Sequence, residues 1–248
     1  MRNDDRPDVG ARRGARGLLD LLDRYPFTLG VLLANALLFA FAAARSGGPS
    51  VAPDVLVALG SNVGSLVPGE PWRLLTSAFL HHDLLHLAFN GLALYSIGRV
   101  LEVHFGSARL WVLFVAMALA GGAASFAWQA ARGAPAISAG ASGGVLGLIT
   151  LGWSFARANP SRLGTLEGSL RSWLVWIAVF SVLFFAQLDH AGHLGGAAAG
   201  LAAGQLVRPR PGADTPPAWE VLAHACSLAV LGAFAAVVVR LRDGPPPL

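Results

Sequence analysis

The sequence of 248 residues contains no lysine, a single cysteine and few charged side chains of either sign. Asp, Glu, Lys and Arg together make up 13% of the chain, whereas soluble globular proteins carry about 25%. A surface that faces only water is therefore excluded. A disulfide within the chain is excluded too, and we expect Cys226 to be a small, buried apolar residue.

Hydrophobic residues make up 54% of the chain and gather in long continuous blocks. Blocks of this kind are typical of helices that cross a bilayer, which need about 20 apolar residues. The 30 glycines favour the same interpretation, because glycine lets membrane helices approach closely. We expect seven spans, at residues 27–44, 83–103, 110–131, 140–156, 171–189, 190–207 and 219–240.

These blocks predict an all-α fold, a polytopic membrane helical bundle, with a tight turn at residues 187–190 between the fifth and sixth spans. We see no soluble second domain and no solenoid repeat. The expected segments are a cytoplasmic N-terminal tail at 1–26, a six-span core at 27–207, a Pro-rich linker at 208–218, a seventh transmembrane helix at 219–240 and a C-terminal tail at 241–248.

The formal charge of +4 comes from arginines that lie between the apolar blocks. A basic chain can indicate nucleic-acid binding, but arginine in short loops is explained better by membrane orientation. With the N-terminus inside, thirteen of the eighteen arginines lie on the cytoplasmic side. We therefore expect an integral membrane protein with a cytoplasmic N-terminus and no nucleic-acid partner. A bacterial inner membrane is favoured, because the short tail lacks the Ser-rich character of a transit peptide.

Three polar segments interrupt the apolar pattern, where the second, fourth and sixth spans begin. They are residues 81–90, 140–144 and 189–196. Because these three spans run in the same direction, their first residues lie at one membrane face. Ionisable groups inside a membrane are costly and are functional candidates for that reason.

Ser142 and His193 are the candidate nucleophile and general base. Each lies a few residues into its span, so both lie several Å below the surface. Glycines recur every four residues from Gly192 to Gly204, and the fourth span carries glycines at the same spacing. Such faces allow close helix contact, which would bring the hydroxyl and the imidazole within hydrogen-bond reach. Nucleophilic catalysis by serine requires that pairing.

His86 and Asn90 lie on one face of the second span, because they are four residues apart. Their side-chain N–H groups, together with the backbone N–H of Ser142 at a helix N-terminus, can donate to an oxyanion. Asp189 precedes His193 by four residues and is interpreted as a turn or N-cap residue. Asp189 could also orient the His193 side chain if the helix extends back to residue 189, and this alternative stays open.

At these residues the sequence resembles the rhomboid family of intramembrane proteases, over roughly residues 27–207. The resemblance implies a rhomboid-like six-helix core, here with an extra C-terminal transmembrane helix. It rests on Trp72-Arg73, the H-x4-H-x3-N pattern of His81, His86 and Asn90, Glu102, Gly106, the motif Gly140-Ala141-Ser142-Gly143, and His193-Leu194-Gly195-Gly196 with Gly200. Of these, Trp72, Arg73, Glu102, Gly196 and Gly200 are expected to be structural.

The resemblance further implies a serine endopeptidase that cleaves transmembrane helices of other membrane proteins near the outer face, through an acyl-enzyme. Ser142 and His193 would form the dyad, with an oxyanion site from His86, Asn90 and the Ser142 backbone. The fifth span would act as a lateral gate. Substrate or cavity contacts are expected from His190, His81, Gly140 and Ala141. Partners are transmembrane substrates and the lipid bilayer, and no metal or other cofactor is expected.

Two positions depart from the family pattern. Leu146 stands where the family often has an aromatic residue that packs on the catalytic histidine. His190 stands where Asn is common, and both substrate binding and mere exposure to a water-filled cavity stay open for it. A non-catalytic protein that captures client helices is the main alternative function, and a transporter is a weaker one. The presence of both Ser142 and His193 favours the protease.

Overall fold

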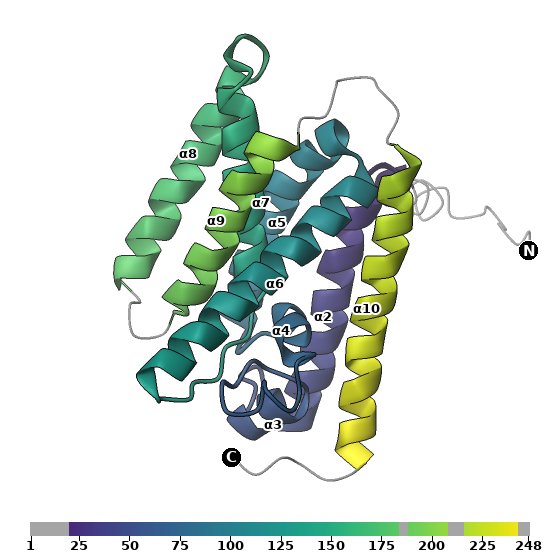
Figure 1. Cartoon of the computed structure of the whole chain (residues 1–248), viewed down its shortest axis with the longest axis vertical. Helices are drawn as coiled ribbons and strands as arrows, with labels where there is room; N and C mark the ends of the chain where they lie inside the picture. The colour runs from purple at the N-terminus through teal and green to yellow at the C-terminus, as the bar shows by residue number, and fades with distance from the viewer. Residues whose placement is uncertain (1–19, 184–187, 208–215, 243–248) are drawn as a thin grey trace, which may run out of the picture.

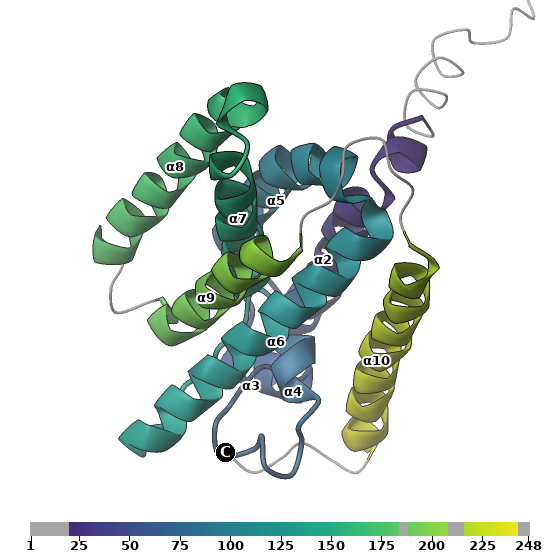
Figure 2. The ribbon, with the colours of Figure 1, turned by 45° about the horizontal axis from the view of Figure 1, so that its top comes forward.

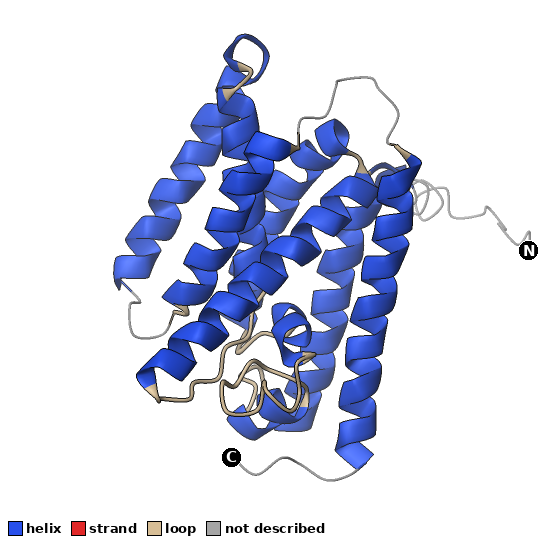
Figure 3. Ribbon diagram, viewed as in Figure 1, coloured by secondary structure: helices blue, strands red, loops and turns tan. Residues whose placement is uncertain are grey.

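The computed structural model describes residues 20–183, 188–207 and 216–242, and its secondary structure is helical (Figure 3). Within these residues the only β-type pairings are isolated bridges, between Ser50 and Asp83 and between Asn62 and Ser138. The predicted all-α bundle is confirmed. Its elements are α2 (Pro26–Ser46), α3 (Pro53–Ala58), α4 (Arg73–Thr76), the 3-10 helix η1 (Ser77–Phe79), α5 (Leu84–Phe105), α6 (Ser107–Arg132), α7 (Ser142–Arg157), α8 (Pro160–Leu183), α9 (His190–Leu206) and α10 (Pro217–Arg242).

Helix α7 lies among α5, α6, α8 and α9 and contacts all four (Figure 1). Helix α6 packs alongside α9, and α8 and α10 lie on opposite sides of the bundle (Figure 2). Helices α3, α4 and η1 belong to the long connection between α2 and α5 and lie together at one end. Helices α5, α7 and α9 all begin toward that end, which therefore collects the three polar segments.

Glycine lets α7 and α9 pack backbone against backbone, as the sequence predicts. A Cβ atom at Gly196 would collide with the carbonyl oxygen of Gly143, and one at Gly200 would collide with that of Gly147. No side chain larger than hydrogen fits at either contact. The small-residue face of α9 thus fixes how far α9 lies from α7, and with it the distance between the residues that these helices carry.

The other glycines of the fourth block face different neighbours, which corrects the symmetrical groove that the spacing suggests. A Cβ atom at Gly144 would meet the Phe114 ring of α6 at 2.6 Å. Gly140 lies before α7, with a φ of +147° that is incompatible with helix. Ser142 is therefore the first residue of α7 and does not lie a few residues into it.

Four helices in the described part of the chain are long and apolar enough to cross a membrane: α2, α5, α6 and α10. Helices α7 and α9 have 16 and 17 residues, which at 1.5 Å per residue is about 25 Å. That length is slightly below the roughly 30 Å of a hydrocarbon core. A helix enclosed by other helices does not have to match the lipid thickness, so the count of seven spans stays a prediction.

The boundaries of α8 differ most from the expected block at 171–189, since α8 runs from Pro160 to Leu183. Hydropathy marks the part of a helix that suits lipid, whereas the helix itself begins earlier, at a proline that fits the first helical position. Of the predicted turn at 187–190, Gln187 lies outside the described residues, and α9 begins at His190 as expected. The predicted tails and the linker lie largely outside the described residues too.

Candidate active site

Two of the three polar segments begin their helices with an aspartate cap. The Asp83 side chain accepts a hydrogen bond from the backbone N–H of His86 at 2.8 Å, at the start of α5. The Asp189 side chain accepts one from the N–H of Gly192 at 2.9 Å, at the start of α9. The N-cap interpretation of Asp189 is confirmed. Each cap satisfies an otherwise unpaired N–H group and fixes where its helix begins.

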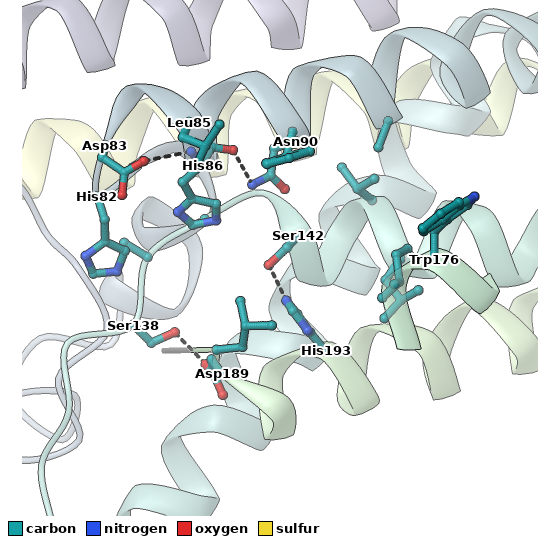
Figure 4. A pocket seen from close by; sticks show the side chains of 18 of the residues that line it. His82, Asp83, Leu85, His86, Asn90, Ser138, Ser142, Trp176, Asp189 and His193 are labelled. Carbon is teal, nitrogen blue, oxygen red and sulfur yellow. Dashed lines mark hydrogen bonds between the residues drawn. The ribbon is translucent and has the colours of Figure 1, made fainter. Parts of the chain in front are cut away.

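The side chains of Ser142 and His193 meet across the contact between α7 and α9. His193 Nε2 lies 2.8 Å from Ser142 Oγ (Figure 4). The other ring nitrogen, Nδ1, is buried and has no hydrogen-bond partner among the described residues. With the proton on Nδ1, the Nε2 lone pair accepts the hydrogen bond from the serine hydroxyl. This is the arrangement in which an imidazole can remove the hydroxyl proton.

His86 extends from α5 toward the backbone just before Ser142. A Cβ atom at Gly140 would lie 2.9 Å from His86 Nε2 and 3.6 Å from Ser142 Oγ. The open space over Gly140 is therefore shared by the imidazole and the hydroxyl. A donor in that position points at the place where negative charge develops when the hydroxyl attacks a carbonyl.

Two further histidines hold the His86 ring. The ring of His82 is stacked on it at 5.8 Å, and the ring of His81 meets it edge-on at 5.2 Å. His81 is 1% exposed, and burial, with the nearby His86 and His82, lowers its pKa to about 3. At neutral pH His81 is therefore uncharged.

Asn90 lies one helical turn after His86 and lines the same cavity. Its Nδ2 atom donates to the backbone carbonyl of His86 at 3.0 Å. A side-chain amide carries a second N–H, so this bond orients the Asn90 side chain and leaves a donor for the cavity. His86 and Asn90 thus lie on the same face of α5, as their spacing predicts.

A cavity of about 560 Å³ is lined by Ser142, His193, His86 and Asn90, among other residues. One wall comes from α5 and another from α8, while α7, the 137–140 segment and the start of α9 form the rest. Most of the lining away from the polar groups is apolar, from Leu85, Phe89, Ala93, Val145, Leu146, Trp173, Trp176 and Ile177. The combination is an apolar cleft with polar donors gathered at one place.

The four residues from which substrate or cavity contacts were expected lie in different places. Gly140 lines the cavity, whereas His190, His81 and Ala141 are not among its lining residues. Ala141 is fully buried at the start of α7, and His81 lies behind the ring of His86. A direct substrate contact by His81 or Ala141 stays a prediction, and in this structure both residues are buried beside the cavity.

The arginine expected to be structural, Arg73, is 1% exposed and organises the connection between α2 and α5. Its NH1 atom donates to the carbonyls of Val57 at 2.8 Å and Ser61 at 2.9 Å, and its Nε atom donates to Glu70 at 2.7 Å. The neighbouring Trp72 packs against the main core.

The acidic residue expected to be structural, Glu102, is 4% exposed near the end of α5. Its carboxylate accepts the backbone N–H of Phe27 at 2.7 Å and that of Thr28 at 3.0 Å. The Thr28 hydroxyl donates to it as well, at 2.7 Å. The carboxylate therefore caps the first turn of α2 and joins α2 to α5.

Among the residues around the site to which the sequence analysis gave no role are Ser138, Asp83 and Glu70. Asp83 carries a local signal, because an aspartate directly before an apolar block is a typical N-cap. Glu70 lies three residues before Arg73, a spacing that also indicates a pair within one turn. Ser138 has no such signal, since its partners are distant in the sequence. Metal-ligating groups of three or more His, Cys, Asp or Glu side chains are not found in the described ranges.

Comparison with known proteins finds similarity to one family. The Rhomboid domain model matches residues 68–210. Rhomboid protease GluP of Bacillus subtilis (strain 168) is 35% identical over 185 residues, which cover 74% of this chain and 35% of GluP. RHOMBOID-like protein 5 of Arabidopsis thaliana is 32% identical over 219 residues, covering 84% of this chain and 64% of the relative.

A second bacterial protein, Rhomboid protease GlpG of Enterobacter sp. (strain 638), is 30% identical over 181 residues. The match covers 71% of this chain and 61% of that GlpG. The chain thus spans about a third of the length of GluP and slightly less than two thirds of the other two.

Proposed function

The chain belongs to the rhomboid family, and on that premise we propose that it is an intramembrane serine endopeptidase. It is an integral membrane protein, since the family match accompanies four helices apolar and long enough to cross a bilayer. Its substrates are transmembrane helices of other membrane proteins. The observation that carries the proposal is the 2.8 Å contact between Ser142 Oγ and His193 Nε2 inside an apolar cavity.

Acylation begins when His193 Nε2 takes the proton of the Ser142 hydroxyl. Oγ then attacks the carbonyl carbon of the scissile peptide bond, and the carbonyl π electrons move to its oxygen. The tetrahedral intermediate collapses as the protonated His193 gives its proton to the leaving nitrogen. The C–N bond breaks, one fragment leaves with a new amine, and the other remains as an ester of Ser142.

The oxyanion of that intermediate is stabilised by three donors. The His86 ring extends over Gly140, where the oxyanion forms next to Oγ. The second N–H of the Asn90 amide and the backbone N–H of Ser142 complete the site. An apolar cavity strengthens such hydrogen bonds, and loss of one donor from an oxyanion hole typically costs about 100- to 1,000-fold in rate.

Hydrolysis of the ester reverses the proton transfers. A water molecule loses a proton to His193 Nε2 and its oxygen attacks the ester carbonyl, with the same donors at the oxyanion. Oγ leaves, recovers the proton from His193, and the second fragment departs as a carboxylic acid. The net reaction consumes one water for each peptide bond, and no step requires a metal or another cofactor.

The cavity walls support a hydrophobic segment as substrate. Trp173, Trp176 and Ile177 of α8 face the cavity that Leu85 and Phe89 of α5 also line. A peptide carbonyl in an intact helix is enclosed by its own turn, so a helix has to unwind before Oγ can reach it. Entry between α5 and α8 then gives α8 the role of a lateral gate.

The membrane face at which the reaction takes place is inferred from how the arginines are distributed between the two sides of the membrane. With a cytoplasmic N-terminus, the starts of α5, α7 and α9 lie at the outer face, where water enters. We place the chain in the bacterial inner membrane, with cleavage close to the outer surface. His190, at the start of α9, then lies beside the path of water or substrate.

Labelling with a fluorophosphonate separates this proposal from non-catalytic capture of client helices. The purified chain in detergent is expected to form one covalent adduct, located on Ser142 by peptide mass mapping. His193→Ala is expected to lower the labelling rate by about 1,000-fold or more, since the hydroxyl loses its base. Ser96→Ala is the matched control, because the Ser96 hydroxyl bonds only to its own helix, at Leu92. A wild-type chain that stays unlabelled would favour capture.

A further inference from the structure

Ser138 joins three separate parts of the chain just before Ser142. Its backbone N–H and C=O form a two-way bridge with Asn62 of the α2–α5 connection, with both N···O distances at 2.9 Å. Two residues further on, the N–H of Gly140 donates to the carbonyl of Ser77 at 2.9 Å. The segment that leads into the nucleophile is therefore tied to the connection between α2 and α5 on its backbone side.

The Ser138 side chain makes the third attachment, to α9. Its hydroxyl donates a short hydrogen bond to Asp189 Oδ2 (Figure 4). The other carboxylate oxygen, Oδ1, accepts the N–H of Gly192, and the Asp189 carbonyl accepts the N–H of His193 at 3.0 Å. A single aspartate therefore holds the first turn of α9 and the segment before α7 together.

Among the residues that the structure describes, none bonds to the His193 ring in the way that orients the histidine of a three-residue serine hydrolase site. Its Nδ1 atom is buried without a hydrogen bond in the described part of the chain. The Asp189 carboxylate bonds to Gly192 N and Ser138 Oγ, and no hydrogen bond joins it to Nδ1 of the His193 ring. The position of the imidazole then depends on where the first turn of α9 lies relative to Ser142.

We propose that Asp189 is a positioning residue for the dyad, acting through the Ser138 hydroxyl to hold the start of α9 against the segment that carries Ser142. The proposal rests on the proposed protease function. In a Ser-His-Asp triad the aspartate bonds to the imidazole and so orients it. Here the Asp189 carboxylate would position the imidazole indirectly, by holding the backbone of the first turn of α9. Both Ser138 and Asp189 line the cavity into which Ser142 and His193 also face.

Ser138→Ala is the informative variant, because it removes the link and leaves the N-cap bond of Asp189 to Gly192 intact. We expect the rate constant for fluorophosphonate acylation of Ser142 to fall by about 10-fold, since misplacement by about 1 Å costs up to roughly 100-fold. Ser138→Thr keeps a hydroxyl and is expected to restore the rate. For cleavage of a transmembrane substrate, the loss is expected in kcat and not in KM.

Two comparisons separate positioning from general loss of structure. The thermal midpoint of Ser138→Ala is expected to match that of the control Ser96→Ala, whose hydroxyl bonds only to its own helix. Asp189→Ala loses both bonds, and adding Ser138→Ala to it is expected to cause no further fall in acylation rate, as for two partners of one interaction. Amide hydrogen exchange across residues 189–193 is expected to quicken in Ser138→Ala.

The outcomes distinguish this proposal from the proposed function. If the wild-type chain is not acylated at Ser142, the protease function fails and the positioning role fails with it. If the wild type is acylated and Ser138→Ala reacts at the same rate, the function stands and the positioning role is overturned. A fall in rate that Ser138→Thr does not restore, or that follows a lowered thermal midpoint, also overturns it.

Discussion

Arg240 in α10 and Glu70 in the connection between α2 and α5 form an ion pair, with 2.7 Å between Nε and Oε1, although 170 residues separate them. Glu70 also pairs with Arg73, so one carboxylate serves two guanidinium groups. Phe234 of α10 also meets Phe79 of η1, with their ring centroids 6.0 Å apart. The last helix thereby supports the connection that carries Ser77 and Asn62, the backbone partners of the segment before Ser142.

Substitution of Glu70 and substitution of Arg240 are expected to lower the free energy of unfolding by different amounts. Glu70→Gln leaves the Arg73 guanidinium, 1% exposed, without its counter-charge, and breaking a buried pair typically costs about 3–5 kcal/mol. Arg240→Ala leaves the pair of Glu70 with Arg73 in place and is expected to cost about 1 kcal/mol. Denaturation in mild detergent measures both.

Arg242→Ala is the control for this comparison, because Arg242 is exposed two residues further along α10. It is expected to leave the stability unchanged. Equal losses from Glu70→Gln and Arg240→Ala would show that the carboxylate serves α10 alone and not the buried Arg73.

Adding a single methyl group at the contact between α7 and α9 is expected to destabilise the fold. In Gly196→Ala the added Cβ meets the Gly143 carbonyl, and neither backbone can yield without separating the helices. We expect a loss of about 3 kcal/mol or more, at the upper end of what overpacking costs, with loss of fluorophosphonate labelling. Gly30→Ala is the matched control, since no atom lies within 4 Å of a Cβ at that exposed position of α2. A folded, labelled Gly196→Ala protein would contradict this packing.

Leu146 lines the cavity one helical turn after Ser142, at the position where an aromatic residue was expected from the family pattern. Leu146→Phe adds a ring that can pack on the imidazole of His193, whose Nδ1 atom has no partner in the described chain. An aromatic contact contributes about 0.5–1.5 kcal/mol, so acylation is expected to become about 2- to 10-fold faster. Leu92→Phe, on the exposed side of α5, should leave the rate unchanged. An unchanged or slower rate in Leu146→Phe would show that Leu146 already positions His193.

Acid is expected to destabilise the chain through His81. Its pKa is about 3 in the folded chain, because of burial first and of the neighbouring histidines second, and about 6.5 when unfolded. Between these values the unfolded chain binds more protons at this position, so the free energy of unfolding falls as the pH is lowered from 6.5. His81→Phe should therefore lose less thermal stability than wild type between pH 7 and pH 5. His224→Phe, at an exposed position of α10, should behave as wild type. If His81→Phe loses as much as wild type, His81 is not the group responsible.

The parts of the site that the sequence predicts are those with a local signal. Ser142, His193, His86 and Asn90 were found because polar residues at the start of apolar blocks are unusual. The packing of α7 on α9 followed from glycines at a spacing of four.

The parts that the sequence could not predict depend on contacts between distant segments. The link from Ser138 to Asp189 and the pair of Arg240 with Glu70 join residues whose own neighbourhoods carry no sign of the partner. The start of α8 at Pro160 was missed because hydropathy reports the lipid-facing part of a helix and not its first turn.

Cleavage of a single-span substrate in liposomes tests the central claim most directly. The purified chain is expected to cut the substrate within its transmembrane segment, near one membrane face, and Ser96→Ala should cut at the wild-type rate. Ser142→Ala, which removes the hydroxyl that lies 2.8 Å from His193 Nε2, is expected to abolish cutting while its thermal midpoint stays near that of wild type. Continued cleavage by a folded Ser142→Ala protein would contradict the account.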